Sequence, residues 1–174
     1  MILFDPDLEL GPAPESASAE QGCASVSAVF PKSLRLPSAR TLGRFLAEAQ
    51  AAARLRGEVD VQLTTDRAIR RLNRQFRGKN KTTDVLSFPA GGMGAEGIAG
   101  DLAISVDTAR RQAAEQGHRL SVEIKVLILH GLLHLAGYDH ETDDGRMARR
   151  ERLLRARLGL PQGLIERASG EERP

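Results

Sequence analysis

One stretch of this 174-residue chain stands out, residues 126–140, which read VLILHGLLHLAGYDH. It contains three of the four histidines, and leucine, isoleucine and valine surround the first two of them. The apolar run is too short to cross a bilayer. It predicts instead a helix from Ser121 to about Ala136, near the C-terminal end of the chain, in which two histidine rings are buried among apolar side chains.

The spacing of the histidines predicts a shared metal site. His130 and His134 are four residues apart, so on a helix their rings lie one turn apart and about 40° around the axis. His140 would point away if the helix continued, because six more residues turn it by about 240°. Gly137 can adopt the left-handed conformation that ends a helix and lets the chain turn back. The sequence therefore interrupts the helix where a third ligand requires it.

Metal binding competes with a simpler interpretation, in which His130 and His134 are ordinary core histidines. A buried polar group without a partner costs about 1–3 kcal/mol, and one cation would satisfy both rings. Three neutral imidazoles suit Zn²⁺ and leave a fourth position for water, which is the composition of a catalytic site. A single cysteine, Cys23, excludes a multi-thiolate zinc site. We therefore predict one Zn²⁺ per chain, held by His130, His134 and His140, and interpret His118 as a surface histidine.

A zinc peptidase is the first alternative enzyme class. Its H-E-x-x-H helix carries a glutamate that acts as general base, whereas this chain has Gly131 at that position. The alternative therefore requires a substitute among the acids that follow the helix: Asp139, Glu141, Asp143 and Asp144. Asp139 also has two other interpretations, as a group that orients an imidazole and as a helix cap.

A second feature is a basic run between Asp66 and Lys81, in which Asp66 is the only acid. The whole chain is nearly balanced, with 25 basic and 23 acidic residues and a formal net charge of +2. A solvated helix face normally intersperses acids, whereas clustered arginine is a common footprint of phosphate binding. Both interpretations stay open for the residues expected on a helix: Arg67, Arg70, Arg71 and Arg74. Functional groups concentrate in loops, and the expected loop carries Arg77, Lys79 and Lys81.

The rest of the chain predicts a single α+β domain, because strands fall in its first two thirds and helices dominate its end. Residues 1–10 predict an N-terminal strand and 11–33 a flexible insertion. The main domain is expected over 34–160, joined by that strand and followed by a tail at 161–174. Its expected elements are a helix from Ser38, a strand around Val59, Val61 and Leu63, a helix capped by Asp66, a strand at 84–89, a loop at 90–100, a strand through Leu102, Ile104 and Val106, a helix from Asp107, the histidine-bearing helix and a last helix from Asp143 or Asp144.

Composition excludes some classes of protein. Aromatic residues make up only 3% of the chain, which argues against modules that stack bases on ring faces, such as RRM and OB folds. The N-terminus lacks the basic region of a secretory leader. We therefore expect a cytoplasmic protein that does not insert into a membrane.

Three blocks of the sequence resemble the YbeY family of bacterial rRNA-maturation endoribonucleases. Residues 130–140 match its H-G-x-L-H-L-x-G-Y-D-H signature. LNRQFRGK at 72–79 and TDVLSFP at 83–89 resemble its L-N-x-x-[YF]-R-x-K and T-[DN]-V-L-S-F-P motifs, and GDLAI at 100–104 resembles its L-G-D-[IL]-x-I strand. The resemblance extends from about residue 38 to 160. The insertion at 11–30 and Ala99, where the family usually has leucine, depart from it.

This resemblance implies a small mixed β-sheet packed by helices, with the zinc-binding helix near the C-terminal end. It implies zinc on the three matching histidines and an Arg77 that is important for activity. It also implies single-stranded RNA as substrate, in particular precursor rRNA of the small ribosomal subunit near its 3′ end, and a role in ribosome quality control. The implied partners are the small ribosomal subunit and assembly factors.

The leading hypothesis is a zinc-dependent endoribonuclease whose catalytic residues are Arg77 and the ligand His134. Arg77 would stabilise charge on the scissile phosphate, and RNA binding would involve Arg74, Lys79 and Lys81 at flanking phosphates. Two alternatives stay open: the zinc-dependent peptide hydrolase, and a non-catalytic ribosome-assembly factor in which the zinc is structural. The sequence assigns no general base.

Overall fold

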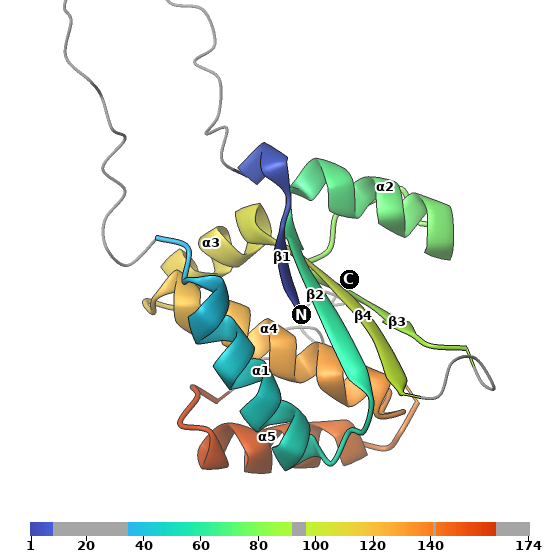
Figure 1. Ribbon diagram of the computed structural model, residues 1–174, viewed down its shortest axis with the longest axis vertical. Coiled ribbons are helices and arrows are strands. Elements are labelled where there is room, and N and C mark those ends of the chain that lie inside the picture. The colour runs from blue at the N-terminus through green and yellow to red at the C-terminus, as the bar shows by residue number, and fades with distance from the viewer. Residues whose placement is uncertain (9–34, 92–96, 141, 163–174) are drawn as a thin grey trace, which may run out of the picture.

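The computed structural model describes residues 1–8, 35–91, 97–140 and 142–162 (Figure 1). Within these ranges the strands are β1 (Ile2–Phe4), β2 (Glu58–Thr64), β3 (Val85–Pro89) and β4 (Ile98–Ser105). The α-helices are α1 (Ala39–Ala53), α2 (Asp66–Arg77), α3 (Val106–Glu115), α4 (Leu120–Leu135) and α5 (Arg146–Arg157), and a short 3-10 helix, η1 (Pro6–Leu8), follows β1. The predicted insertion at 11–33 and most of the predicted tail at 161–174 lie outside the described residues.

The four strands form one mixed sheet in the order β1-β2-β4-β3. β1, β2 and β4 run parallel to one another, and β3 pairs antiparallel with β4. A parallel pair needs a crossover connection, and helices lie between these strands along the chain: α1 between β1 and β2, and α2 between β2 and β4. The α+β class and the mixed sheet expected from the sequence are thereby confirmed.

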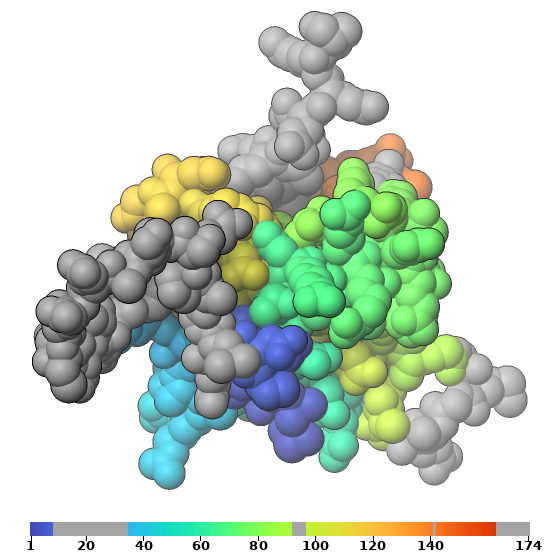
Figure 2. All heavy atoms as spheres, turned by 90° about the horizontal axis from the view of Figure 1, so that it is seen from above, coloured from blue at the N-terminus to red at the C-terminus, as the bar shows by residue number. Residues whose placement is uncertain are grey.

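The helices cover the sheet unequally because alternate residues of a strand point to opposite faces. Leu102 and Ile104 of β4 join the main core, which α1, α4 and α5 complete. Ala103, between them, faces the other way and packs with Ile69 of α2 and Leu86 of β3. Figure 1 accordingly shows α1, α4 and α5 on one side of the sheet and α2 on the other. Seen from above in Figure 2, α2 lies beside α3 and the N-terminal residues on this face of the molecule.

Helix α4 is the centre of the fold. Every residue from Glu123 to Leu133 is buried except Lys125, as expected for a helix that is apolar on nearly all sides. It contacts α1, α3 and α5 as well as β3 and β4. Side chains at its C-terminal end are therefore held by packing from several directions. None of the helices in the described part of the chain combines the length and apolar character needed to cross a membrane.

Two helices begin with a cap that precedes the aspartate predicted to start them. The hydroxyl of Thr65, not the carboxylate of Asp66, caps α2 by accepting the backbone N–H of Ala68. Ser105 caps α3 in the same way, so Val106, expected in a strand, is the first residue of the helix. In both cases a hydroxyl one or two positions before the predicted aspartate accepts a free N–H group of the first turn. The predicted cap Ser38 of α1 is confirmed.

Three further boundaries differ from the sequence predictions. α4 starts at Leu120, one residue before Ser121. α5 starts at Arg146 after Gly145, although the carboxylate of Asp143 does accept the N–H of Met147. The strand expected over 1–10 ends at Phe4, because Pro6 starts η1, and proline with its constrained φ suits the first turn of a helix.

Strand β4 begins inside the glycine-rich segment 90–100 that was expected to be a loop. Gly100 is part of the strand, pairing with Val59 and Pro89, and has a φ of +142°. A β-carbon there would lie 2.9 Å from Cδ2 of Leu135 and would also collide with the backbone of Phe88. Glycine is needed at this position because α4 approaches the strand closely, so its presence does not indicate a loop.

Candidate metal centre and basic pocket

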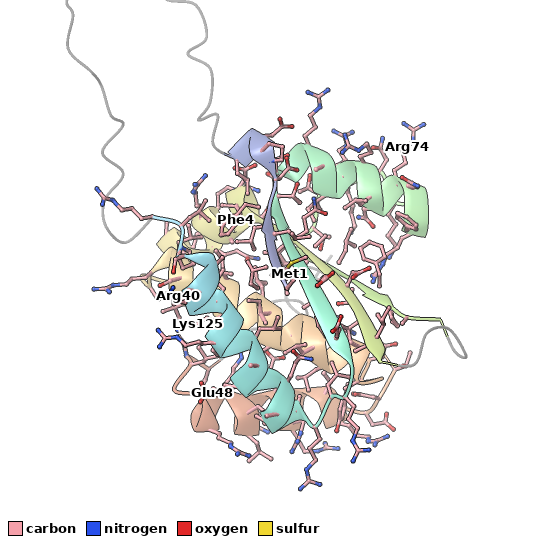
Figure 3. The ribbon with its side chains drawn as sticks, viewed as in Figure 1. Met1, Phe4, Arg40, Glu48, Arg74 and Lys125 are labelled. Carbon is pink, nitrogen blue, oxygen red and sulfur yellow. The ribbon has the colours of Figure 1, made fainter. Side chains whose placement is uncertain are left out.

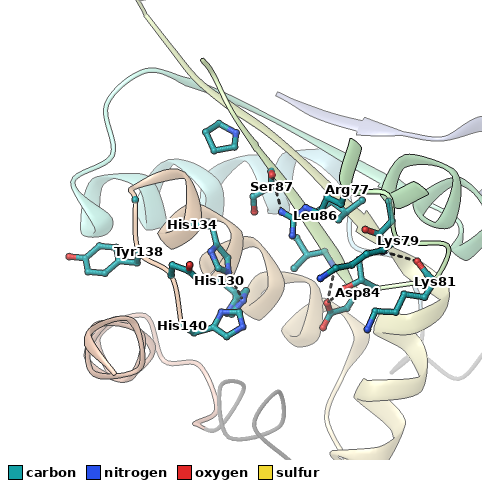
Figure 4. A pocket seen from close by; sticks show the side chains of 16 residues that line it. Arg77, Lys79, Lys81, Asp84, Leu86, Ser87, His130, His134, Tyr138 and His140 are labelled. Atoms are coloured by element: carbon teal, nitrogen blue, oxygen red, sulfur yellow. Dashed lines mark hydrogen bonds between the residues drawn. The ribbon is translucent and has the colours of Figure 1, made fainter. Parts of the chain in front are cut away.

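The three predicted ligands come together at the C-terminal end of α4. Nε2 of His130 lies 3.1 Å from Nε2 of His134, and the ring centroid of His140 lies 5.5 Å and 5.2 Å from those of His130 and His134. One potential ligand atom from each of the three rings lies within 4.8 Å of those from the others. The close-up in Figure 4 shows the three rings facing one another. The predicted constellation exists.

The turn after α4 brings His140 to the other two rings. Gly137 has a φ of +85°, and its N–H donates to the carbonyl of His134, while the N–H of Tyr138 donates to the carbonyl of Leu133. This pair of hydrogen bonds is the Schellman pattern, in which a left-handed residue ends the helix and satisfies its last carbonyls. The left-handed conformation predicted for Gly137 is confirmed, and so is its consequence for His140.

The environment favours a neutral His134. Burial, together with the neighbouring His130 and His140, lowers the pKa of His134 to about 4, against the opposing effects of the Tyr138 backbone and Asp139. An imidazole binds a metal through a lone pair, so the neutral form is the one required. At neutral pH His134 is therefore ready to act as a ligand without first losing a proton.

A buried carboxylate lies behind the first ligand. Oε2 of Glu151, on α5, is 3.3 Å from Nδ1 of His130, and Oε1 accepts a hydrogen bond from Arg155. Burial alone would raise the pKa of Glu151, but His130 and Arg155 outweigh it and lower the pKa. Glu151 is thus ionised, and it engages the nitrogen of His130 that faces away from the other two rings.

The residues fit a single metal ion. A tetrahedral ion with bonds of about 2.0–2.1 Å holds neighbouring ligand nitrogens about 3.3 Å apart, close to the separation of the two Nε2 atoms. Nδ1 of His140 is buried and has no hydrogen-bond partner within the described residues. Three imidazoles without a fourth protein donor form an open donor set, because no other His, Cys, Asp or Glu of the described part joins the cluster.

A pocket of about 600 Å³ opens beside the histidines. Its opposite wall carries three cations, Arg77, Lys79 and Lys81, which come from the end of α2 and the segment that follows (Figure 4). None of the three makes an ion pair within the described residues. The pocket therefore combines a candidate metal site with unpaired positive charge, an arrangement suited to a phosphodiester.

Buried contacts hold the cationic wall in position. Asn73, which is 2% exposed, donates from Nδ2 to the main-chain carbonyl of Lys81, and its main-chain carbonyl accepts the backbone N–H of Lys79. Arg77 donates to the carbonyl of Ser87 at 3.4 Å. Arg77 is the last residue of α2 and not part of the following loop as predicted, because the helix continues to Gly78, its left-handed cap. The cations thus extend from an ordered turn.

Not every predicted residue lies at the pocket. Arg74 is exposed on the outer side of α2 and points away from the sheet in Figure 3, so it does not line the pocket. Asp139 does line it and accepts a hydrogen bond from Thr142. The interpretation of His118 as a surface histidine is wrong. Its side chain is only 15% exposed and pairs with the fully buried carboxylate of Glu123, which lies in the first turn of α4.

Sequence reasoning missed several residues of this site. Asn73, Asp84, Ser87 and Tyr138 line the pocket, and Glu151 supports His130 from behind. A signal for Glu151 was present: the buried face of α5 consists of Met147, Glu151, Leu154 and Arg155, an apolar stripe that contains an i,i+4 acid–base pair. Charged residues on such a stripe are rarely buried unless they are paired.

Comparisons with known proteins find similar chains. A family model described as Endoribonuclease YbeY matches residues 32–159. Endoribonuclease YbeY of Koribacter versatilis is 50% identical over 141 residues, covering 81% of this chain and 91% of that protein. That of Solibacter usitatus is 52% identical over 137 residues, covering 79% of this chain and 88% of that protein. The solution structure of TM1509 from Thermotoga maritima is 26% identical with a TM-score of 0.50, covering 80% of this chain and 93% of that one.

Proposed function

This chain belongs to the YbeY endoribonuclease family, and from that membership and its pocket we propose that it is a metal-dependent endoribonuclease acting in rRNA maturation. One structural observation supports this most directly. The three converging imidazoles and three unpaired cations line the same pocket. A phosphodiester that contacts both would have its charge neutralised from two sides.

We propose Zn²⁺ as the metal. Three neutral imidazoles without a thiolate suit zinc, and the site offers them in an open arrangement. His130, His134 and His140 would hold the ion, one per chain. A bound zinc supplies Lewis acidity toward a phosphate oxygen or an attacking water molecule.

The basic residues of the pocket would bind the phosphates of the RNA. Arg77, the cation anchored at Ser87, stabilises charge on the scissile phosphate, as a planar guanidinium can bind two phosphate oxygens at once. Lys79 and Lys81 hold flanking phosphates along the wall of the pocket. Arg74, on the outer side of α2, would contact only RNA that extends beyond the pocket. His134 would contribute to catalysis only by binding the metal ion.

The finer expectations concern the substrate and its setting. We propose single-stranded RNA as the substrate, as the family resemblance implies. Four further expectations from the resemblance stay predictions: precursor small-subunit rRNA near its 3′ end, ribosome quality control, the small subunit and assembly factors. A cytoplasmic location, expected from the sequence, also stays a prediction.

The peptide-hydrolase alternative is not favoured. The helix position where zinc peptidases carry their glutamate is Gly131, and it faces β4: a β-carbon there would lie 2.6 Å from Cδ2 of Leu102. A glutamate would not fit this interface without displacing the side chain of Leu102. The named relatives are endoribonucleases, which also argues against an assembly factor with a purely structural metal.

The proposal is tested with nuclease-free protein on a defined single-stranded RNA. Cleavage should disappear on chelation, return with zinc, and fall to background in His134→Ala. A His134→Ala protein as active as the parent would contradict the mechanism. The product ends distinguish the two nucleophiles, since a 3′-hydroxyl indicates attack by water, whereas a 2′,3′-cyclic phosphate indicates attack by the neighbouring 2′-hydroxyl.

A further inference from the structure

We propose that Glu151, held in place by Arg155, is a positioning residue of the metal centre: it keeps His130 in the tautomer whose Nε2 faces the other ligands and thereby sets the affinity for the cation. The inference rests on the metal site proposed above. It makes α5, a helix that carries none of the ligands, part of the site.

The contacts form a chain of three buried side chains. Nδ1 of His130 lies 3.3 Å from Oε2 of Glu151, whose Oε1 accepts a hydrogen bond from Arg155. His130, Glu151 and Arg155 are 8%, 2% and 1% exposed. Arg155 also donates to the carbonyl of Pro161 at 2.9 Å, which anchors the guanidinium beyond the helix. Each group therefore orients the next, ending at the ring of a ligand.

A purely structural role explains this arrangement poorly. Met147 and Leu154 occupy the same buried face of α5 and join the main core. A buried ion pair is often no more stabilising than apolar residues of similar volume, because both charges lose their hydration. An apolar pair at 151 and 155 would serve the packing of α5 on α4. Such an apolar pair could not accept a hydrogen bond from Nδ1–H of His130.

The carboxylate determines which nitrogen of His130 carries a lone pair. With Nδ1–H donating to Glu151, the lone pair is on Nε2, the atom that lies 3.1 Å from Nε2 of His134. A carboxylate that accepts this hydrogen bond also makes the ring a stronger donor to a cation. Carboxylate partners of this kind typically contribute 10–100-fold to metal affinity.

Glu151 acts only through His130. Both of its oxygens are engaged, and it does not line the pocket where an RNA phosphate would bind. It is therefore not the general base that the reaction needs. A change at Glu151 should alter how tightly the metal is held, without removing any contact to the RNA.

The test compares Glu151→Gln with Glu123→Gln. Glu123 is a matched control: it is also fully buried and pairs with a histidine, but that histidine is His118, which is not a ligand. Zinc affinity is measured by competition with a chromogenic chelator, and the unfolding of the metal-free proteins by urea. We expect Glu151→Gln to weaken zinc binding about tenfold or more, and Glu123→Gln to leave it unchanged. Parental zinc affinity in Glu151→Gln would overturn the proposal and leave the residue a structural support.

A second measurement needs no variant and covers the case in which Glu151→Gln does not fold. In the zinc-bound parent labelled with ¹⁵N-histidine, the ring nitrogen shifts of His130 should show a protonated Nδ1 and a metal-bound Nε2. Metal bonding through Nδ1 would overturn the proposal, because Glu151 would then have no proton to accept. Neither readout depends on RNA cleavage, so failure of the proposed function would be seen separately, as zinc-loaded parent that cuts no RNA.

Discussion

Leu102 of β4 packs directly against Gly131 of α4, so closely that a β-carbon on Gly131 would lie 2.6 Å from Cδ2 of the leucine. This contact joins the ligand-bearing helix to the centre of the sheet, one residue after His130. Leu102 is 1% exposed and has little room to move aside. The spacing between α4 and β4 therefore depends on the absence of a side chain.

Replacing Gly131 by alanine should destabilise the protein by about 1–3 kcal/mol, because overpacking outweighs the better helix propensity of alanine. Urea unfolding of the metal-free protein measures this. Gly43→Ala is the matched control, since Gly43 lies inside α1 with nothing within 4 Å of its added β-carbon. That variant should gain about 0.5–1 kcal/mol. Equal gains in both variants would show that the α4–β4 contact imposes no constraint.

Replacing Arg77 by alanine should lower kcat/KM on single-stranded RNA by about 100-fold, the usual scale for losing one group that stabilises transition-state charge. Arg74→Ala removes the same charge from the outer side of α2 and should change kcat/KM only a few-fold, mainly through KM. Zinc content should be unchanged in both. Similar losses in the two variants would indicate a general electrostatic effect and no special role for the pocket.

Removing the third predicted ligand, His140, should remove most of the stabilisation by zinc. At zinc concentrations about 100-fold above the dissociation constant, the parent should gain about 2.7 kcal/mol of unfolding free energy. His140→Ala should lose most of this increment, whereas His118→Ala should retain it although it breaks the pair with Glu123. Thermal unfolding with and without zinc separates the two effects. An undiminished increment in His140→Ala would rule out the third ligand.

Asp66 should make stability depend on acid pH. Burial alone would raise its pKa, but hydrogen bonds from Ser105, Thr108 and Arg111 and the charge of Arg111 lower the pKa below 3.8. The folded protein therefore binds the proton less tightly than the unfolded chain. This contribution is present above the unfolded-state pKa and is lost as the pH falls through the lower folded-state value.

Asp66→Asn should accordingly cost about 1–2 kcal/mol at pH 7, with a gap to the parent that narrows below about pH 4. Urea unfolding at several pH values measures the gap. A difference that stays constant down to the acid limit would show that the carboxylate charge does not contribute.

The features predicted correctly from the sequence are those that local geometry determines. The spacing of His130 and His134 and the glycine at 137 define the site, because one helix, its Schellman turn and the residues directly after the turn contain all three histidines. The alternating strands and the buried helix likewise follow from local periodicity. The α+β class could therefore be predicted without knowledge of long-range contacts.

The features that were missed depend on tertiary packing. Glu151 reaches His130 only because α5 folds back onto α4, and the role of Gly100 is visible only once Leu135 and Phe88 are seen around it. The surface assignment of His118 failed for the same reason, since its polar neighbours gave no sign of the buried Glu123. The local sequence pattern shows which residue types are present. The role of each residue depends on partners that are distant in sequence but adjacent in the fold.

The ligands differ in how they are supported, and this has a consequence for metal exchange. His130 and His134 belong to the most buried helix, whereas His140 follows the turn at Gly137 and precedes the start of α5. If an ion were bound by the three rings, His140 would be the ligand best able to move away from it, while His130 and His134 would stay fixed on α4. Such a centre could exchange its ion with cellular chelators without unfolding the domain that carries it.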